Sequence, residues 1–322
     1  MQQMKSIVAI FKDERDQGLW AAYLDGISAL WSITAHEGLG HALERLIGRG
    51  IDPCLVILSS RLYPTEDPEL VARIRGYFPE AELLLISSSE EPSPPLLPLC
   101  ADTVRHLAVN STPGDPLGKE YFEGVLQKLV AGRPWSIGDC LGSQTGVRSI
   151  ELRSSNQKEG VVGALEAAIA GVGDEFELFR QRGALLADEL MENAMYGAPR
   201  DAEGEKLFKK GEERELLPEE RLVFSFGFDG ETLAMEMADN WGTLDPDLVV
   251  EYLARNQAQP GGWDDLGGRG LFLIWRFFDH FHVSVVPGKR TVVGGDLRLS
   301  RTLDPEAPRG FHITEHKKGD AA

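Results

Sequence analysis

Short apolar segments alternate with segments of helical periodicity through the first part of the chain, and this alternation most constrains the fold. The predicted strands are Ser6–Phe11, Leu30–Thr34, Cys54–Leu58, Glu82–Ile86 and Val104–Val109. The predicted helices are Leu19–Leu30, Leu39–Ile47, Leu70–Tyr77 and a segment from about Gly118 to Val130. A continuous apolar strand such as CLVIL suits the middle of a parallel sheet. The pattern therefore predicts a doubly wound α/β domain over residues 1–132.

The second half of the chain contains a helix with two polar residues one turn apart. Glu189 and Asn193 lie four residues apart in a helix predicted over Phe176–Tyr196, so they share one face. A carboxylate and an amide oxygen at this spacing can orient a water molecule and bind a divalent cation. The alternative is that Glu189 and Asn193 simply lie on the solvent-exposed face of an amphipathic helix, because apolar residues at helical spacing occupy its opposite side.

Two glycine-bearing segments follow downstream. Asp239 ends a strand-like run, and the turn after it contains Gly242. A carboxylate held there can accept a hydrogen bond from an exocyclic amine. Further on, the glycines of GGRG precede the apolar helix predicted over Leu271–Phe278, an arrangement that presents backbone N–H groups to phosphate. The alternative is a glycine-rich turn before a core helix.

These three segments, in this order, resemble the ATP-binding domain of the GHKL superfamily. The first matches its N-box, and the other two match its glycine boxes. The sequence GGRGLFLIWRFFDHF is similar to the corresponding segment of the anti-sigma-factor serine kinases. The resemblance covers Ser149 to Leu303 and implies an α+β two-layer sandwich over residues 149–303. Each of the two glycine boxes departs from the family pattern. In the first, Trp241 and Thr243 flank a single Gly242, and in the second, Phe272 stands in place of a later glycine.

The resemblance also implies a role for each matching residue. Glu189 would be the general base and Asn193 the Mg²⁺ ligand. Asp239 would read the adenine of ATP. The remaining nucleotide-binding set would be Gly242, Gly267, Gly268, Arg269, Gly270 and Leu271. Arg269 is equally well interpreted as an ordinary surface arginine.

The N-terminal domain is similar to a response-regulator receiver. Asp13 and Glu14 follow its first strand as an acidic pair that could hold a cation, although two acids in that place also suit a solvated loop. Ser59 stands where the family has its phosphoacceptor aspartate, and Pro64 matches a following proline. A serine hydroxyl is not ionised near neutral pH, so aspartyl phosphorylation is not expected. The resemblance therefore implies a degenerate receiver that serves as a docking or dimerisation module.

Composition narrows the classes of partner. The formal net charge is −18, with 42% hydrophobic and 26% charged residues. Nucleic acids and anionic membranes need clustered Lys and Arg, so neither is expected, and protein partners are favoured. Cys54, Cys100 and Cys140 lie far apart and indicate neither a disulfide framework nor a zinc site. No secretory leader and no apolar run of ~18 residues is present, so a cytoplasmic location is expected.

Four further segments carry expectations about organisation. Residues 133–148 are rich in Gly and Ser and predict a linker, and residues 304–322 predict a flexible tail. More than half of the residues of Pro199–Glu220 are charged, which is typical of a solvated loop; the alternative is an excursion beside a nucleotide. Leu244–Asp265 corresponds to the mobile ATP lid of the family. His280 and His282 are expected to be ordinary surface or edge residues.

The resulting expectation is a bacterial signalling protein that binds Mg-ATP. It would phosphorylate a serine on an anti-sigma antagonist protein or hold a regulator such as a sigma factor, and related domains are commonly homodimers. A non-catalytic ATP-gated interaction switch is the rival from another class; it would not need Glu189. A histidine kinase is disfavoured, because His106, the last histidine before Glu189, falls on a predicted strand.

Overall fold

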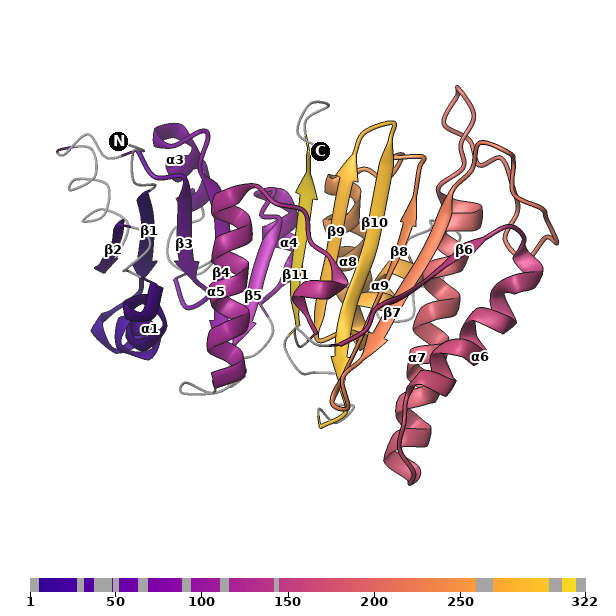
Figure 1. Cartoon of the computed structure of the whole chain (residues 1–322). Coiled ribbons are helices and arrows are strands. Elements are labelled where there is room, and N and C mark those ends of the chain that lie inside the picture. The colour runs from indigo at the N-terminus through magenta and orange to yellow at the C-terminus, as the bar shows by residue number, and fades with distance from the viewer. Residues whose placement is uncertain are drawn as a thin grey trace, which may run out of the picture. The chain divides into compact units, whose positions relative to one another are not determined.

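The computed structural model describes residues 6–27, 32–37, 48, 52–62, 69–88, 94–110, 116–141, 145–258, 269–300 and 309–316. The chain divides into two compact units, each with its own strands and helices (Figure 1). The first unit comprises Met1–Arg133 and Glu306–Gly310. The second comprises Pro134–Pro305 and Phe311–Ala322.

A parallel sheet forms the centre of the first unit. Its strands are β1 (Ser6–Phe11), β2 (Ser32–Glu37), β3 (Leu55–Ser59), β4 (Glu82–Ser88) and β5 (His106–Asn110), in the spatial order β2-β1-β3-β4-β5. The pairs β1–β2, β1–β3, β3–β4 and β4–β5 are all parallel. Flavodoxins and receiver domains share this order. The first unit therefore has the α/β receiver-like fold that the alternation of strands and helices predicts.

The composition of these strands explains their central place. Ile7, Val8, Val56 and Ile57 have 0% exposure, as expected for strands covered on both faces. The helices of the unit are α1 (Glu14–Ile27), α3 (Leu70–Tyr77), α4 (Leu96–Ala101) and α5 (Pro116–Ala131). Helix α4 was not predicted, since it is short and Pro98 interrupts its pattern. The helix predicted over Leu39–Ile47 lies outside the described residues.

A largely antiparallel sheet forms the second unit. Its strands are β6 (Arg148–Leu152), β7 (Leu222–Phe228), β8 (Thr232–Asp239), β9 (His280–Val286), β10 (Arg290–Arg298) and β11 (Gly310–Glu315), in the order β11-β9-β10-β8-β7-β6. The pairs β6–β7, β7–β8, β8–β10 and β10–β9 are antiparallel. The helices are α6 (Lys158–Ala168), α7 (Asp174–Glu192), α8 (Pro246–Ala258) and α9 (Arg269–Phe277).

Strand β8 shows what covers each face of this sheet, because its successive side chains point to opposite sides. Leu233 meets helix α7: a Cβ added at Gly183 would lie 2.9 Å from its Cδ2 atom. On the other side, Ala234 packs against Ile137. Glu236 accepts the Ile137 amide there at 3.0 Å. Helices therefore cover one face, and residues 134–141 cover part of the other.

The segment predicted as a linker thus belongs to the core of the second unit. Ser136 caps a 3-10 turn over Ile137–Asp139 by a capping box. Trp135 and Ile137 are buried, and Trp135 stacks on His312 with 4.3 Å between the ring centroids. The prediction of a plain linker over 133–148 is wrong for these residues, because its few large apolar side chains were outweighed by glycine and serine.

The prediction of a flexible tail over 304–322 is wrong for residues 310–315, which form β11. Phe311 and Ile313 in this strand have 0% exposure, and the His316 amide donates to the Val285 carbonyl at 2.8 Å. The strand is only six residues long and follows two prolines, so its pattern was too short to be recognised. Among the described residues, no helix is both long and apolar enough to cross a bilayer.

Candidate functional site

Helix α7 places Glu189 and Asn193 and changes its geometry between them. Its buried stripe includes Leu186, Leu190 and Met191. After Glu192 the helix continues as a π-turn over Asn193–Gly197, in which the Ala198 amide donates to the Asn193 carbonyl at 3.0 Å. Single π-turns of this kind are frequent at functional sites. The widened turn begins at one of the two residues that the sequence singles out.

Gly270 lies directly against both of these polar side chains. A Cβ added at position 270 would lie 2.8 Å from Glu189 Oε2 and 3.0 Å from both Asn193 Oδ1 and Nδ2. Gly270 is the second residue of α9, so glycine allows the first turn of that helix to approach α7 closely. The N-terminal turn of a helix has backbone N–H groups without intrahelical partners. The structure therefore joins two of the three predicted segments.

Asp239, from the third segment, ends β8 and is buried, with 6% exposure. Its Oδ1 atom accepts the amides of Trp241 at 2.9 Å and Gly242 at 3.3 Å. Burial raises the pKa of Asp239 to about 6, against the opposing effect of the Trp241, Gly242 and Thr291 hydrogen bonds. Gly242 has φ +61°, and a Cβ there would lie 2.4 Å from the Val286 carbonyl oxygen. A glycine is therefore required at this turn.

One cavity of about 540 Å³ connects Asp239 with Asn193. Its apolar lining includes Leu190, Met237, Leu271 and Val293. Its polar lining includes Asn193, Arg200, Lys206, Asp239, Thr243 and Thr291. Small-molecule pockets are typically of this size, with apolar walls and a few placed polar groups. The Nδ2 atom of Asn193 is buried and has no hydrogen-bond partner among the described residues.

The charged segment, Pro199–Glu220, lies beside this cavity. Arg200 and Lys206 face each other in an isolated antiparallel bridge, and both line the cavity. The turn between them is ordered by Asp201, whose Oδ1 accepts the amides of Glu203 at 3.1 Å and Glu205 at 2.8 Å. Like charges opposite each other are unfavourable in a strand pair. The cavity lining thus combines these two cations with the carboxylates of Asp239 and Asp245.

Buried contacts hold the charged segment in place. The guanidinium of Arg214 pairs with Glu220, with the two side chains 6% and 0% exposed, and donates to the Met195 carbonyl at 2.9 Å. The Phe208 ring centroid lies 3.6 Å from the same guanidinium. The Tyr196 hydroxyl donates to the Glu212 carbonyl. These contacts anchor the segment beside the cavity, while most of its other side chains are exposed, as expected for a solvated loop.

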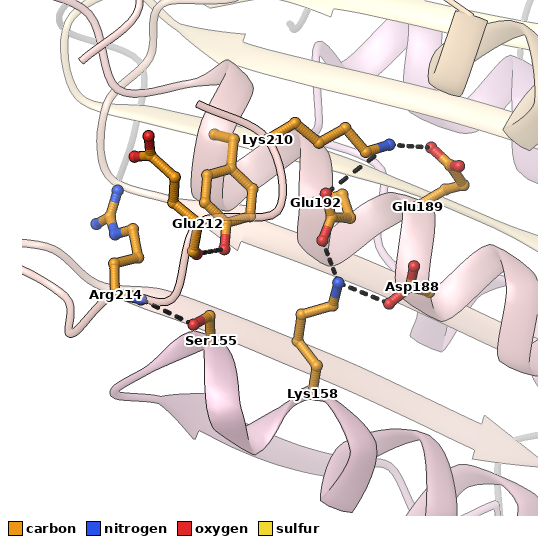
Figure 2. A network of polar contacts seen from close by, with 9 residues as sticks. Ser155, Lys158, Asp188, Glu189, Glu192, Lys210, Glu212 and Arg214 are labelled. Atoms are coloured by element: carbon orange, nitrogen blue, oxygen red, sulfur yellow. Dashed lines mark hydrogen bonds and ion pairs between the residues drawn. The ribbon is translucent and has the colours of Figure 1, made fainter. Parts of the chain in front are cut away.

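Two lysines neutralise the acidic face of α7 (Figure 2). Lys158 of α6 contacts Glu192 and lies 2.7 Å from Asp188. Burial alone would lower the pKa of Lys158, but the two carboxylates raise it overall. Lys210 of the charged segment lies 3.5 Å from Glu189 and 3.8 Å from Glu192. Neither lysine was predicted as part of the site, because both lie outside the three motifs.

Of the residues that the resemblance implies, five therefore meet at this site: Glu189, Asn193, Asp239, Gly270 and Leu271. Gly242 shapes the adjacent turn. Arg269 begins α9 and is exposed. Gly267 and Gly268, with residues 259–265 of the predicted lid, lie outside the described residues. The described part of the lid forms α8, which contributes Leu248 and Tyr252 to the cavity lining.

The opposite face of the same sheet carries a second polar cluster. His280 Nδ1 lies 2.9 Å from Asp296 Oδ1, and His282 Nε2 lies 3.8 Å from Glu236 Oε2. Both histidines are buried, so the expectation that they are surface or edge residues is wrong. Burial alone would raise the pKa of Asp296, but His280 and Arg298 have the larger opposing effect, so its pKa lies below the usual value. Burial also raises the pKa of Cys140, which contacts Asp296.

The acidic pair of the first unit has a local structural role. The Asp13 Oδ1 atom accepts the Asp16 amide at 2.8 Å, as at a helix N-terminus, and Asp13 and Glu14 are exposed. The buried carboxylate is instead Asp16, which lies 3.9 Å from Arg61. Ser59 accepts the Arg61 amide at 3.3 Å. No group of three or more His, Cys, Asp or Glu side chains that could hold a metal occurs in the described part of the chain.

Comparisons with protein-family models and with curated proteins give no match. The chain is similar to the signal receiver domain of an HD domain-containing protein from Pseudomonas fluorescens Pf-5, at 19% identity and a TM-score of 0.32, covering 41% of this chain and 90% of that one. It is also similar to a pilus assembly-related protein from Burkholderia pseudomallei K96243, at 18% identity and a TM-score of 0.32, covering 42% of this chain and 96% of that one. The receiver-like fold of the first unit rests on its own strand order.

Proposed function

We propose that this chain is a bacterial signalling protein that binds Mg-ATP in the cavity of its second unit and acts as a serine kinase or regulator of a partner protein. The observation that supports this most is the convergence of three distant segments on one cavity. Asp239 lies at one part of its wall, and Asn193, with Gly270 and Glu189 beside it, lies at another. This is the set that the resemblance to GHKL anti-sigma-factor kinases implies.

The part of the cavity around Asp239 suits an adenine ring. Met237, Leu271 and Val293 offer apolar surface to a flat heterocycle. The buried carboxylate of Asp239 would accept a hydrogen bond from the exocyclic amine, which compensates part of the cost of its burial. The two loop amides on Oδ1 hold the carboxylate in one orientation for this purpose.

The part around Asn193 suits a metal-bound polyphosphate. The Asn193 amide supplies an oxygen ligand for Mg²⁺, and its buried Nδ2 has hydrogen-bonding capacity left over. Gly270 leaves space beside it at the beginning of α9, where backbone N–H groups favour anions. Arg200 and Lys206 add positive charge to the wall. When bound there, Mg-ATP would supply the phosphoryl group for transfer.

Glu189 is placed to act as the general base. Its side chain is 17% exposed and lies on the same helical face as Asn193. A carboxylate in this position would take the proton from an incoming serine hydroxyl and orient that hydroxyl beside the metal site. An antagonist protein with a reactive serine is the substrate class that this chemistry fits. A sigma factor or similar regulator is the alternative partner.

The first unit would serve as a docking module. Its fold is that of a receiver, but Ser59 occupies the place of the phosphoacceptor, and the adjacent buried acid, Asp16, is paired with Arg61. Aspartyl phosphorylation at that place is therefore not part of the proposal. The net charge of −18 favours a protein as the partner of such a surface.

The proposal is tested by calorimetric titration of ATP with Mg²⁺, followed by an assay of ADP release from the same samples with a candidate partner present. We expect the Asp239→Asn variant to lose binding and the Glu189→Ala variant to keep binding but lose ADP release. Asp229→Asn, at the exposed turn that begins β8, keeps the acceptor for the Glu231 and Thr232 amides and is the matched control.

Each pattern of results points to a different conclusion. Binding without ADP release, in the wild type and with partners present, would favour the ATP-gated interaction switch over the kinase. Equal binding by the wild type and Asp239→Asn would remove the adenine site from the proposal. No binding by the wild type would refute the nucleotide function altogether.

A further inference from the structure

We propose that Lys210 is a positioning residue that exchanges between Glu189, in the nucleotide-free protein, and the terminal phosphate of bound ATP. The inference rests on the proposed function and deepens it, since it names a determinant of ATP over ADP. Lys210 belongs to none of the three motifs that resemble the family. Its position beside Glu189 is determined by the fold of the charged segment, Pro199–Glu220.

A tight turn presents Lys210 to the site. The Glu212 amide donates to the Lys209 carbonyl at 3.2 Å, which makes Lys209–Glu212 a β-turn. Gly211, its third residue, has φ +84°. A turn with positive φ at the third position is type II, and glycine is the preferred residue there. Lys210 therefore occupies the second position of a defined turn.

Both ends of this turn are fixed to the surrounding protein. The Glu212 side chain accepts the Lys209 amide at 3.3 Å, and the Glu212 carbonyl accepts the Tyr196 hydroxyl from the π-turn of α7. Two residues later, Arg214 makes its buried pair with Glu220. The backbone of the turn is therefore tied to the helix that carries Glu189 and Asn193. The lysine side chain is 63% exposed and free to change rotamer.

The strengths of the ion pairs favour exchange. At 3.5 Å and 63% exposure of the lysine, the Lys210–Glu189 contact is a weak pair that a stronger anion can replace. A phosphate oxygen with more negative charge is such an anion. Glu192 keeps Lys158 when Lys210 leaves, so its charge stays compensated. Glu189 is the carboxylate that gains freedom, and a general base needs that freedom to meet a hydroxyl proton.

The position of Lys210 distinguishes it from the other cations of the charged segment. Arg200 and Lys206 line the cavity itself, whereas Lys210 contacts Glu189, on the side of Asn193 where Gly270 also lies. Arg200 and Lys206 are therefore expected to contribute to binding of any adenine nucleotide. Lys210 is expected to contribute when a third phosphate is present.

The experiment compares the affinities for Mg-ATP and Mg-ADP by calorimetry in the full chain. We expect Lys210→Gln to weaken ATP binding about tenfold and to change ADP binding less than about twofold, as the loss of one charge-assisted contact implies. Lys210→Arg, which keeps the charge, should restore most of the preference for ATP. Lys209→Gln is the matched control, because it removes one charge from the same turn and should leave both affinities unchanged.

The outcomes separate this inference from the function on which it rests. Suppose that the wild type binds both ADP and ATP, and that Lys210→Gln changes the two affinities equally or not at all. This result would overturn the role of Lys210 and leave the nucleotide site intact. If Lys209→Gln lost as much affinity for ATP as Lys210→Gln, the effect would come from the net charge of the turn. The specific role of Lys210 would then also be overturned. Failure of the wild type to bind either nucleotide would refute both proposals.

Discussion

Asp239 shows at the scale of one residue what a buried carboxylate costs. Its burial disfavours the ionised form, and hydrogen bonds from Trp241, Gly242 and Thr291 recover only part of that free energy, so its pKa remains raised to about 6. A carboxyl group with a raised pKa stabilises the folded state below its unfolded pKa of about 4. That contribution is lost as the pH rises through about 6. At neutral pH the residue therefore destabilises the free protein.

The Asp239→Asn variant should consequently be more stable than the wild type at pH 7.5 in the absence of nucleotide. Asparagine keeps the oxygen that accepts the Trp241 and Gly242 amides but has no charge to bury. We expect the difference in free energy of unfolding to be small at pH 4.5 and on the order of 2 kcal/mol at pH 7.5. Urea unfolding at the two pH values measures it. A variant less stable than the wild type at pH 7.5 would contradict the stated cost of burial.

Glu189, Asn193 and Asp239 could be singled out from the sequence, because each lies at a recognisable place in a helix or after a strand. Lys210, Arg200 and Lys206 could not. Their positions depend on the Asp201 turn, the Gly211 turn and the buried pair of Arg214 with Glu220. A segment dominated by charges has no apolar periodicity from which such anchoring can be inferred.

At the scale of an element, the position of the first turn of helix α9 depends on Gly270, its second residue, which has no side chain. The absence of a side chain at Gly270 lets the first turn of α9 approach the polar face of α7, and Leu271 then enters the cavity lining. Leu271, Ile274 and Trp275 are buried and hold the rest of the helix in place. The helix can therefore be perturbed at its first turn without loss of its packing.

The Gly270→Ala variant should lose nucleotide binding by at least about tenfold while its thermal stability changes by only a few degrees. The added methyl group would lie within 3.0 Å of Glu189 and Asn193, at the end of flexible side chains that can shift away from it. Gly163→Ala is the control: it lies in α6, and nothing is within 4 Å of its added Cβ. That change should leave binding intact and stabilise the protein by about 0.5–1 kcal/mol. Normal nucleotide binding by Gly270→Ala would exclude the space beside Asn193 from the site.

At the scale of the whole molecule, strand β11 determines what the second unit needs to be complete. Phe311 and Ile313 are fully buried, and His316 Nε2 lies 2.9 Å from the Ser284 hydroxyl of β9. The run that ends at Asp239 was recognised as a strand, because β8 is a long and mostly apolar segment. β11 was missed because it is short, follows two prolines and has a histidine, His312, between its two buried apolar side chains.

Deletion of residues 304–322 should therefore destabilise the second unit strongly. The loss of two fully buried side chains alone is expected to cost about 4 kcal/mol or more. Deletion of residues 317–322, beyond the strand, should have little effect and is the control. Thermal unfolding followed by circular dichroism compares the two truncations. Equal melting temperatures for both would restore the interpretation of residues 304–322 as a tail.

Strand β8 has one further consequence, which concerns how a signal can enter the site. It presents Glu236 to the Ile137 amide on one face and Met237 and Asp239 to the cavity on the other. The connection that leaves the first unit and the floor of the cavity are thus opposite sides of a single strand. The contact is made by the Glu236 side chain, so a displacement of residues 134–141 would either move that side chain or break its hydrogen bond. Residues 134–141 therefore contact the same strand whose opposite face lines the cavity.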